Sequence, residues 1–465
     1  MRKNIMRGIV ASDSGGANNL GTSSTDESSL TRSTLAPTLW ICVALAAAFH
    51  IALAGTVLPN TPAGTALRSW LVAFNSGDRA RIESFDQAHA PWLTLDGMMQ
   101  RRARSGGYDL LSVAGSGDFW IVFRARERKS SAEVMGSMVV RSYNPGHVTL
   151  LSFAPAGAHA TEVNLDQAER TRVIDGAAKL LDEYYIYPDV ARKVSAKLKA
   201  LQGRGEYRGI TDGDIFAIRL GDDLVALSGD KHIGVDFFAD GAPALRPPDP
   251  LWLAETNCGF EQADHLPPNI GYLKLTDFAE PENCTRTAIA AMNFLADSDA
   301  LIVDLRDSHG GAPRMAALIA SYLFGRRTHL DDIDYPTKHF TEHLWTLPNL
   351  PGKKFTGKPV FVLTASSTFS AGEEFAYDLQ SLKRATVVGE TTGGGAHAMA
   401  PHKIDDHFYI RVPFARFVNP ITKTDWEGVG VKPDVKVSAA DALAVAERLA
   451  AGEIRKGKSR HPRTD

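Results

Sequence analysis

The strongest constraint in the sequence is an alternation of apolar runs and helical patterns from about residue 268 onward. The apolar runs have the length of strands buried in a sheet, and they read "IGYLKL", "ALIVDLRD", "KPVFVLT" and "RATVVGE". The patterns between them recur at helical spacing, and they read "CTRTAIAAMNFLAD", "APRMAALIASYLFG" and "SAGEEFAYDLQSLK". This alternation predicts an α/β core with a mostly parallel sheet and crossover helices. In such sheets the chemistry lies at the carboxyl ends of the strands.

The chain upstream of this core predicts two more folded units. A helix that places Leu67, Trp70 and Phe74 on one face is followed by three strand-like runs, "FWIVFRARE", "AEVMGSMVVRSY" and "HVTLLSFAPAG". We therefore expect a small α+β domain at 62–156, which resembles the cone-shaped domains of the nuclear-transport-factor and ketosteroid-isomerase type. Three helical patterns closed by the strand "KHIGVDFFAD" predict a helical subdomain at 165–240.

The predicted core then covers 245–450, and the basic segment 451–465 is expected to be a disordered tail. The composition is that of a globular protein, with 44% apolar and 23% charged residues. The net charge of −3 gives no electrostatic reason to bind nucleic acid, so we expect no nucleic-acid partner.

The first residues have the pattern of a leader. Residues 1–38 are polar, and the apolar run 39–57 has a length between that of a signal-peptide core and that of a membrane span. We expect 1–58 to be a signal peptide or a membrane anchor, and the rest to be exported to a periplasmic or extracellular space or tethered at a membrane. In an exported chain Cys258 and Cys284 could pair.

Ser370 lies in the stretch "TASSTFSAGEEFAY", between the end of a predicted buried strand and the start of a predicted helix. With Glu373 three residues later it matches a capping box, so it could simply cap the helix. A serine at a helix N-terminus also lies beside unpaired N–H groups, which stabilise developing negative charge. Ser370 is therefore a candidate nucleophile, and the two roles are compatible.

A serine nucleophile needs a base, and the surrounding stretch offers none. His232, His309 and His397 each lie in a turn or at a strand end, and spacing does not choose among them. The stretch "HFTEH", from His339 to His343, matches a zinc-protease pattern. That chemistry needs a helix, and the flanking prolines argue against one, so we predict an exposed polar segment and no metal there.

Residues 165–450 resemble the tail-specific or carboxy-terminal-processing serine proteases, in the branch that includes tricorn protease and the interphotoreceptor retinoid-binding protein. The stretches that carry the resemblance occur in the family's order: "GYLKLTDF", "ALIVDLRDSHGG", "TASSTFSAGEEFAY", "ATVVGETTGGGAH" and "NPITKTDWEGVGVKPDV". The resemblance implies a crotonase/ClpP-like α/β core, a peptide or protein substrate and no cofactor.

The resemblance also implies roles for particular residues. Ser370 matches the nucleophile, His232 the general base, and Glu427 the glutamate that completes the relay. The oxyanion hole would be formed by the backbone N–H of Ala371 together with Gly310 or Gly311.

Two departures from the family pattern bear on the mechanism. The processing branch uses a lysine base downstream of its serine, and here that region reads "TTGGGAHA". A Ser–Lys dyad is therefore not expected. The second departure is Lys231, which stands where the tricorn branch carries a serine before its histidine.

The rival interpretation is a non-catalytic protein that binds an apolar ligand on the same fold, because fold does not imply function. Convergence of Ser370, His232 and Glu427 within hydrogen-bond reach would favour the hydrolase.

Overall fold

The structure is a computed structural model that describes residues 57–90, 93–156, 165–244 and 250–460. Ala54–Asp465 form one compact unit. The predicted leader lies almost wholly outside the described residues. None of the helices in the described part of the chain is long and apolar enough to cross a membrane.

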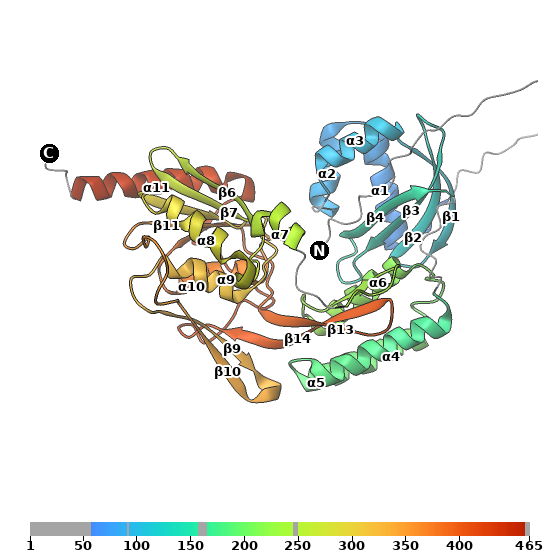
Figure 1. Ribbon diagram of the computed structural model, residues 1–465. Coiled ribbons are helices and arrows are strands. Elements are labelled where there is room, and N and C mark those ends of the chain that lie inside the picture. Colours follow the sequence, from blue (N-terminus) through green and yellow to red (C-terminus); the bar gives the residue numbers. More distant parts are fainter. Residues whose placement is uncertain (1–56, 91–92, 157–164, 245–249, 461–465) are drawn as a thin grey trace, which may run out of the picture. The chain divides into compact units, whose positions relative to one another are not determined.

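Three helices and a four-stranded sheet form the first part of the described chain (Figure 1). The elements are α1 (Pro62–Ser76), α2 (Arg79–His89), α3 (Leu95–Ser105), β1 (Tyr108–Ser116), β2 (Trp120–Glu127), β3 (Glu133–Val140) and β4 (Val148–Pro155). The strands pair antiparallel in sequence order. Leu67, Trp70 and Phe74 of α1 are buried, as their spacing predicted. The pattern analysis did not predict α2, α3 or β1.

Three helices and a short strand follow. They are α4 (Gln167–Tyr184), α5 (Pro188–Gly203), α6 (Gly213–Ser228) and β5 (Gly234–Phe237). The α4 helix begins with a capping box, in which the side chain of Asp166 accepts from the backbone N–H of Glu169 and the side chain of Glu169 accepts from the backbone N–H of Asp166. The α6 helix ends at Gly229, whose φ of 79° is the left-handed conformation that lets the chain turn toward His232.

The core is built on a six-stranded sheet with the strand order β15-β12-β11-β8-β7-β6. Its strands are β6 (Phe260–Leu266), β7 (Ile270–Leu275), β8 (Ala300–Asp304), β11 (Val360–Thr364), β12 (Thr386–Gly389) and β15 (Val435–Lys436). All neighbours pair parallel except β6, which runs antiparallel at one edge. The predicted α/β class is confirmed.

Helices cover both faces of this sheet, and successive residues of β8 show it. Leu301 and Val303 pack in the core that contains α8 (Pro281–Leu295), α9 (Pro313–Ser321) and α10 (Ala371–Ser381). The alternate residues Ala300 and Ile302 pack against α11 (Ala439–Arg460). Burial on both faces explains why these strands read as unbroken apolar runs.

The expected disordered tail at 451–465 was wrong for most of its length, because α11 continues to Arg460. Ala442, Ala446, Ala450 and Ile454 are all buried, and their spacing of four residues places them on one helical face. These four side chains pack on the sheet and stabilise the helix beyond residue 451, in the segment that was predicted to be disordered from its charge alone.

A second, antiparallel sheet has the order β10-β9-β14-β13, and β5 also pairs with β14. Its remaining strands are β9 (His329–Tyr335), β10 (Phe340–Trp345), β13 (His397–Lys403) and β14 (Phe408–Val418). The long strand β14 has residues in two cores: Ile410 packs among α4–α6, and Phe417 packs in the core with α8–α10. The predicted domain boundaries at 156, 165, 240 and 245 stay a prediction, since one compact unit spans them.

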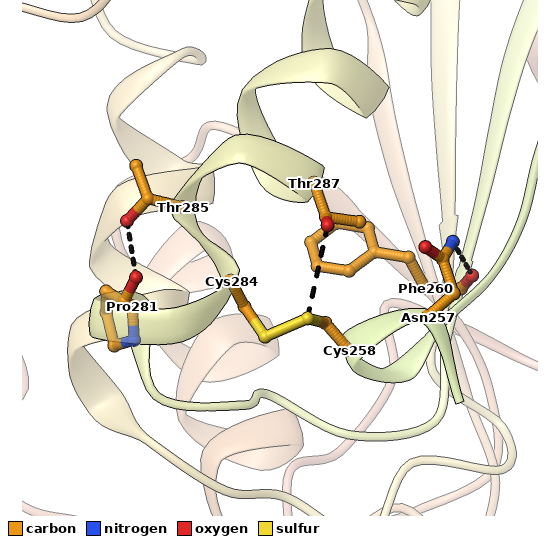
Figure 2. Close-up of a disulfide and its surroundings, with 7 residues drawn as sticks. All are labelled: Asn257, Cys258, Phe260, Pro281, Cys284, Thr285 and Thr287. Carbon is orange, nitrogen blue, oxygen red and sulfur yellow. Dashed lines mark hydrogen bonds between the residues drawn. A yellow bond between two sulfur atoms is a disulfide. The ribbon is translucent and has the colours of Figure 1, made fainter. Parts of the chain in front are cut away.

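A disulfide joins Cys258 to Cys284, with 26 residues of sequence separation (Figure 2). Cys258 belongs to the short 3₁₀ turn Asn257–Gly259, which follows α7 (Pro250–Glu255), and Cys284 lies in the first turn of α8. Thr285 donates to the carbonyl of Pro281 in that turn. The bridge therefore ties the start of β6 to the start of α8.

Candidate active site

Ser370 occupies a sharp turn between β11 and α10. Its φ of 53° and ψ of −123° are unusual for a residue with a side chain, and α10 begins at the next residue. Such strained conformations cost of the order of 1–3 kcal/mol and persist at functional sites where the surrounding structure holds them. The turn resembles the strand-to-helix elbow that exposes a nucleophilic serine in α/β-hydrolases.

The carboxylate of Glu373 holds this turn against the glycine-rich loop at 392–395. Its Oε2 accepts from the backbone N–H of Ser370 at 2.9 Å and from that of Gly395 at 2.9 Å. Its Oε1 accepts from the N–H of Gly394 at 2.6 Å and from the hydroxyl of Thr392 at 2.5 Å. Glu373 is fully buried. The capping motif seen in the sequence is thus also a clamp between two loops.

Gly310 lies directly against Ser370. A Cβ on Gly310 would stand 2.6 Å from the Cβ of Ser370 and 3.0 Å from the backbone nitrogen of Ala371, so only glycine fits. Ala371 is the first residue of α10, and its N–H belongs to the amides that have no partner within the helix. Gly311 instead packs on Phe278, where a Cβ would stand 2.2 Å from the carbonyl oxygen. Of the two predicted glycines, Gly310 is the one beside the serine.

His232 is buried, and neither of its ring nitrogens has a hydrogen-bond partner. Its ring packs on that of Phe369, the residue before Ser370, with centroids 4.7 Å apart. Burial lowers the pKa of His232 to about 4, a shift that nearby Asp230 opposes and His397 reinforces. The imidazole is therefore neutral at pH 7, the form that can accept a proton.

A group of buried polar side chains surrounds His232. Nδ1 of His397 lies 2.7 Å from Oδ2 of Asp230, which also accepts from the hydroxyl of Tyr185 at 3.1 Å. Oε2 of Glu427 lies 3.8 Å from the same His397 nitrogen and accepts from a backbone N–H. Nitrogen and oxygen atoms of Asp230, His232 and Glu427 lie within 4.8 Å of one another. The predicted base and relay acid thus share one cluster.

The electrostatics of this cluster follow from burial and pairing. Burial opposes ionisation of Asp230, but the hydrogen bond and charge of His397 outweigh it and lower its pKa. Burial likewise opposes protonation of His397, but Asp230 outweighs it and raises the pKa. Burial raises the pKa of Glu427 to about 7, although His397 opposes the rise. Their pairing therefore favours the ionised forms of Asp230 and His397, whereas the pKa of Glu427 lies near neutrality.

The predicted catalytic residues are brought together in part. His232 and Glu427 share the cluster, and His232 contacts the residue next to Ser370. No hydrogen bond links a His232 nitrogen to either predicted partner. His309, another candidate base, has a side chain that is 79% exposed and faces Asp277.

Asp230 and His397 were not predicted as members of the site. Asp230 precedes His232 by two residues, and its Oδ1 accepts from the backbone N–H of His232 at 2.9 Å. An aspartate two residues before the candidate base is typical of such a turn, so the sequence alone could have indicated Asp230. His397 was among the histidines considered as the base, but spacing did not select it, because its contact with Asp230 joins residues 167 positions apart.

Comparison with known proteins assigns the family of two segments. Residues 269–437 match Peptidase family S41, and residues 156–250 match the N-terminal domain of that peptidase in eukaryotic IRBP. The chain therefore carries two domains of peptidase family S41, with the N-terminal one preceding the other.

The sequence relatives are processing proteases. The chloroplastic carboxyl-terminal-processing peptidase 2 of Arabidopsis thaliana is 31% identical over 170 residues, which cover 36% of this chain and 32% of that protein. The carboxyl-terminal-processing protease of a Synechocystis strain is 29% identical over 36% of this chain and 37% of its own. The chain thus spans about a third of the length of these relatives.

Two solved structures give weaker likenesses. The tricorn protease has a TM-score of 0.40 at 13% identity, covering 72% of this chain and 43% of that one. The photosystem II D1 C-terminal processing protease has a TM-score of 0.37 at 16% identity, covering 58% of this chain and 93% of that one.

Proposed function

We propose that this protein is a serine-type peptidase that cleaves peptides or unstructured protein ends through an acyl-enzyme. The observation that carries the proposal is the position of Ser370: a strained residue at the carboxyl end of a parallel strand, at a helix N-terminus, with Gly310 packed against it. A residue that only caps a helix adopts an extended conformation and needs neither the strain nor the glycine. The S41 match over the surrounding residues supports the same function.

In the proposed mechanism Oγ of Ser370 attacks the scissile carbonyl carbon, and His232 takes the hydroxyl proton. His232 then protonates the leaving amine as the C–N bond breaks, and water hydrolyses the acyl ester with His232 again as the base. Backbone amides of Ala371 and of Gly310, with Gly311 as the alternative, hold the oxyanion. Asp230 and Glu427 lie near enough to stabilise the imidazolium.

The gap between His232 and Ser370 must close for this chemistry. Hydrogen bonds between catalytic groups are often long or misaligned without substrate and tighten in the complex. No metal or organic cofactor takes part in the proposed reaction.

We propose further that the protein works after export, with the 39–57 segment as its signal peptide or membrane anchor. The Cys258–Cys284 disulfide supports this, since such bonds persist in oxidising compartments. In this proposal the 62–156 domain is a spacer or interaction module.

Labelling with a fluorophosphonate tests the nucleophile. The full chain should be labelled, Ser370→Ala should not be, and Ser366→Ala, an exposed serine of the same turn, should be labelled as well as the wild type. Thermal melts show that each variant is folded. Failure of the folded wild type to label would instead favour a non-catalytic binding protein.

A further inference from the structure

The hairpin of β9 and β10 carries a second cluster of titratable side chains, outside the candidate active site. Nε2 of His329 and Nδ1 of His343 each lie 2.6 Å from Oδ1 of Asp332. We propose that His329, Asp332 and His343 bind a divalent transition-metal ion such as Zn²⁺.

A break in the strand register brings the three side chains together. His329 and Asp332 are three residues apart, so a regular strand would point them to opposite faces. Leu344 pairs with Asp331 but the next residue, Trp345, pairs with His329, so Leu330 is an extra residue in the ladder. A bulge of this kind re-aims side chains. Leu330 and Asp331 are accordingly buried in succession, and His329 and Asp332 both face outward.

The donor set suits the proposed ion. Two imidazoles and one carboxylate are ligands that Zn²⁺ uses when it keeps a further position for water. His343 stands directly opposite Asp332 in the register, so the ligands come from both strands. A tetrahedral site with bonds of about 2.0–2.1 Å needs ligand atoms about 3.3 Å apart. The three ligand atoms lie within 4.8 Å of one another, so small side-chain rotations suffice.

The site is both ordered and reachable. The ring of His329 stacks on that of Trp345, with centroids 4.5 Å apart and planes at 12°, which fixes its orientation. The side chains of Asp332 and His329 are 19% and 25% exposed, and that of His343 is 58% exposed. An ion can therefore enter from solvent, and one coordination position remains open to water.

This site differs from the zinc pattern visible in the sequence. In "HFTEH" the two histidines would act together from a helix, but here β10 is a strand and His339 lies before it, at the turn. His343 has its partners on the neighbouring strand, and His339 is no member of the cluster.

Calorimetric titration of Zn²⁺ into the full chain, stripped of metal and free of a histidine tag, tests the proposal. We expect a site whose affinity falls at least tenfold in His343→Gln and in His329→Gln, as loss of a ligand requires. His339→Gln is the matched control from the same hairpin and should bind as the wild type does. His232→Gln should also keep the site, which separates it from the candidate active site.

Two results would overturn the proposal. One is a wild type that binds no Zn²⁺ at millimolar concentration. The other is binding that is equally strong in His343→Gln, His329→Gln and His339→Gln, which would leave the cluster as a hydrogen-bonded network only. Neither result depends on peptidase activity.

Discussion

The stability of the fold should respond very differently to the same substitution at two neighbouring glutamates of α10. Glu373 and Glu374 are both buried, at 0% and 1% exposure. Glu373 accepts four hydrogen bonds, whereas neither carboxyl oxygen of Glu374 has a partner. The test is Glu373→Gln against Glu374→Gln.

The expected magnitude follows from the hydrogen bonds. An amide keeps only one acceptor oxygen, so Glu373→Gln leaves at least one buried backbone N–H without a partner and weakens the remaining charge-assisted bonds. A buried donor left unsatisfied costs about 1–3 kcal/mol, so we expect a loss of about 2–4 kcal/mol in the free energy of unfolding. Glu374→Gln removes no hydrogen bond and should change that free energy by about 1 kcal/mol or less.

The pH dependence gives a second readout. Burial and the charge of Asp331 raise the pKa of Glu374 well above its usual value. Its protonated form therefore favours the fold at low pH, and this stability is lost as pH rises from about 4.3, the ordinary glutamate pKa, through the raised value. Glu374→Gln should gain on the wild type over that range.

Urea unfolding of both variants at pH 5 and pH 8 measures these differences. Equal destabilisation by the two substitutions, or a larger loss in Glu374→Gln, would refute the assignment of Glu373 as the clamp. Should Glu373→Gln keep wild-type stability, the four hydrogen bonds do not hold the turn.

Two predictions concern peptide cleavage. Gly310→Ala should lower kcat by about 10²–10³, because a methyl group 2.6 Å from the Cβ of Ser370 displaces an oxyanion donor. Gly325→Ala is the control and should leave kcat unchanged, since its new methyl group has no neighbour nearer than 3.8 Å. Equal rates in the two variants would exclude Gly310 from the site. The pKa of Glu427 is about 7, so if its ionised form is the active one, kcat/KM rises with pH through about 7 in the wild type. That limb should vanish in Glu427→Gln, and its persistence in a pH profile would show that another group sets it.

The sequence was most informative where structure is local or periodic. The apolar runs at β8, β11 and β12 and the helices between them were predicted because burial on both faces leaves an unbroken apolar pattern. The place of Ser370 between strand and helix followed from the same pattern. The candidate base and acid were named from the family resemblance alone, since no local pattern selected them, and their roles stay a prediction.

The antiparallel sheet of β9, β10, β13 and β14 was not predicted. The strands β9 and β10 carry many polar residues, and β9 contains a bulge that breaks the alternation on which a strand pattern relies. The segment after 451 was misjudged because its charges hid the continuation of α11, whose buried stripe of Ala442, Ala446 and Ala450 reaches into this segment at Ile454.

The sequence by itself determined the α/β class, the order of the central parallel strands and the helices between them, and the residue that heads α10, because each depends on periodicity over a few turns. Only the tertiary structure decided which titratable side chains meet. Asp230 meets His397 across 167 residues, and His343 meets Asp332 across a hairpin. Such contacts depend on how the strands pair and on which polar side chains are buried together, and local sequence spacing predicts neither.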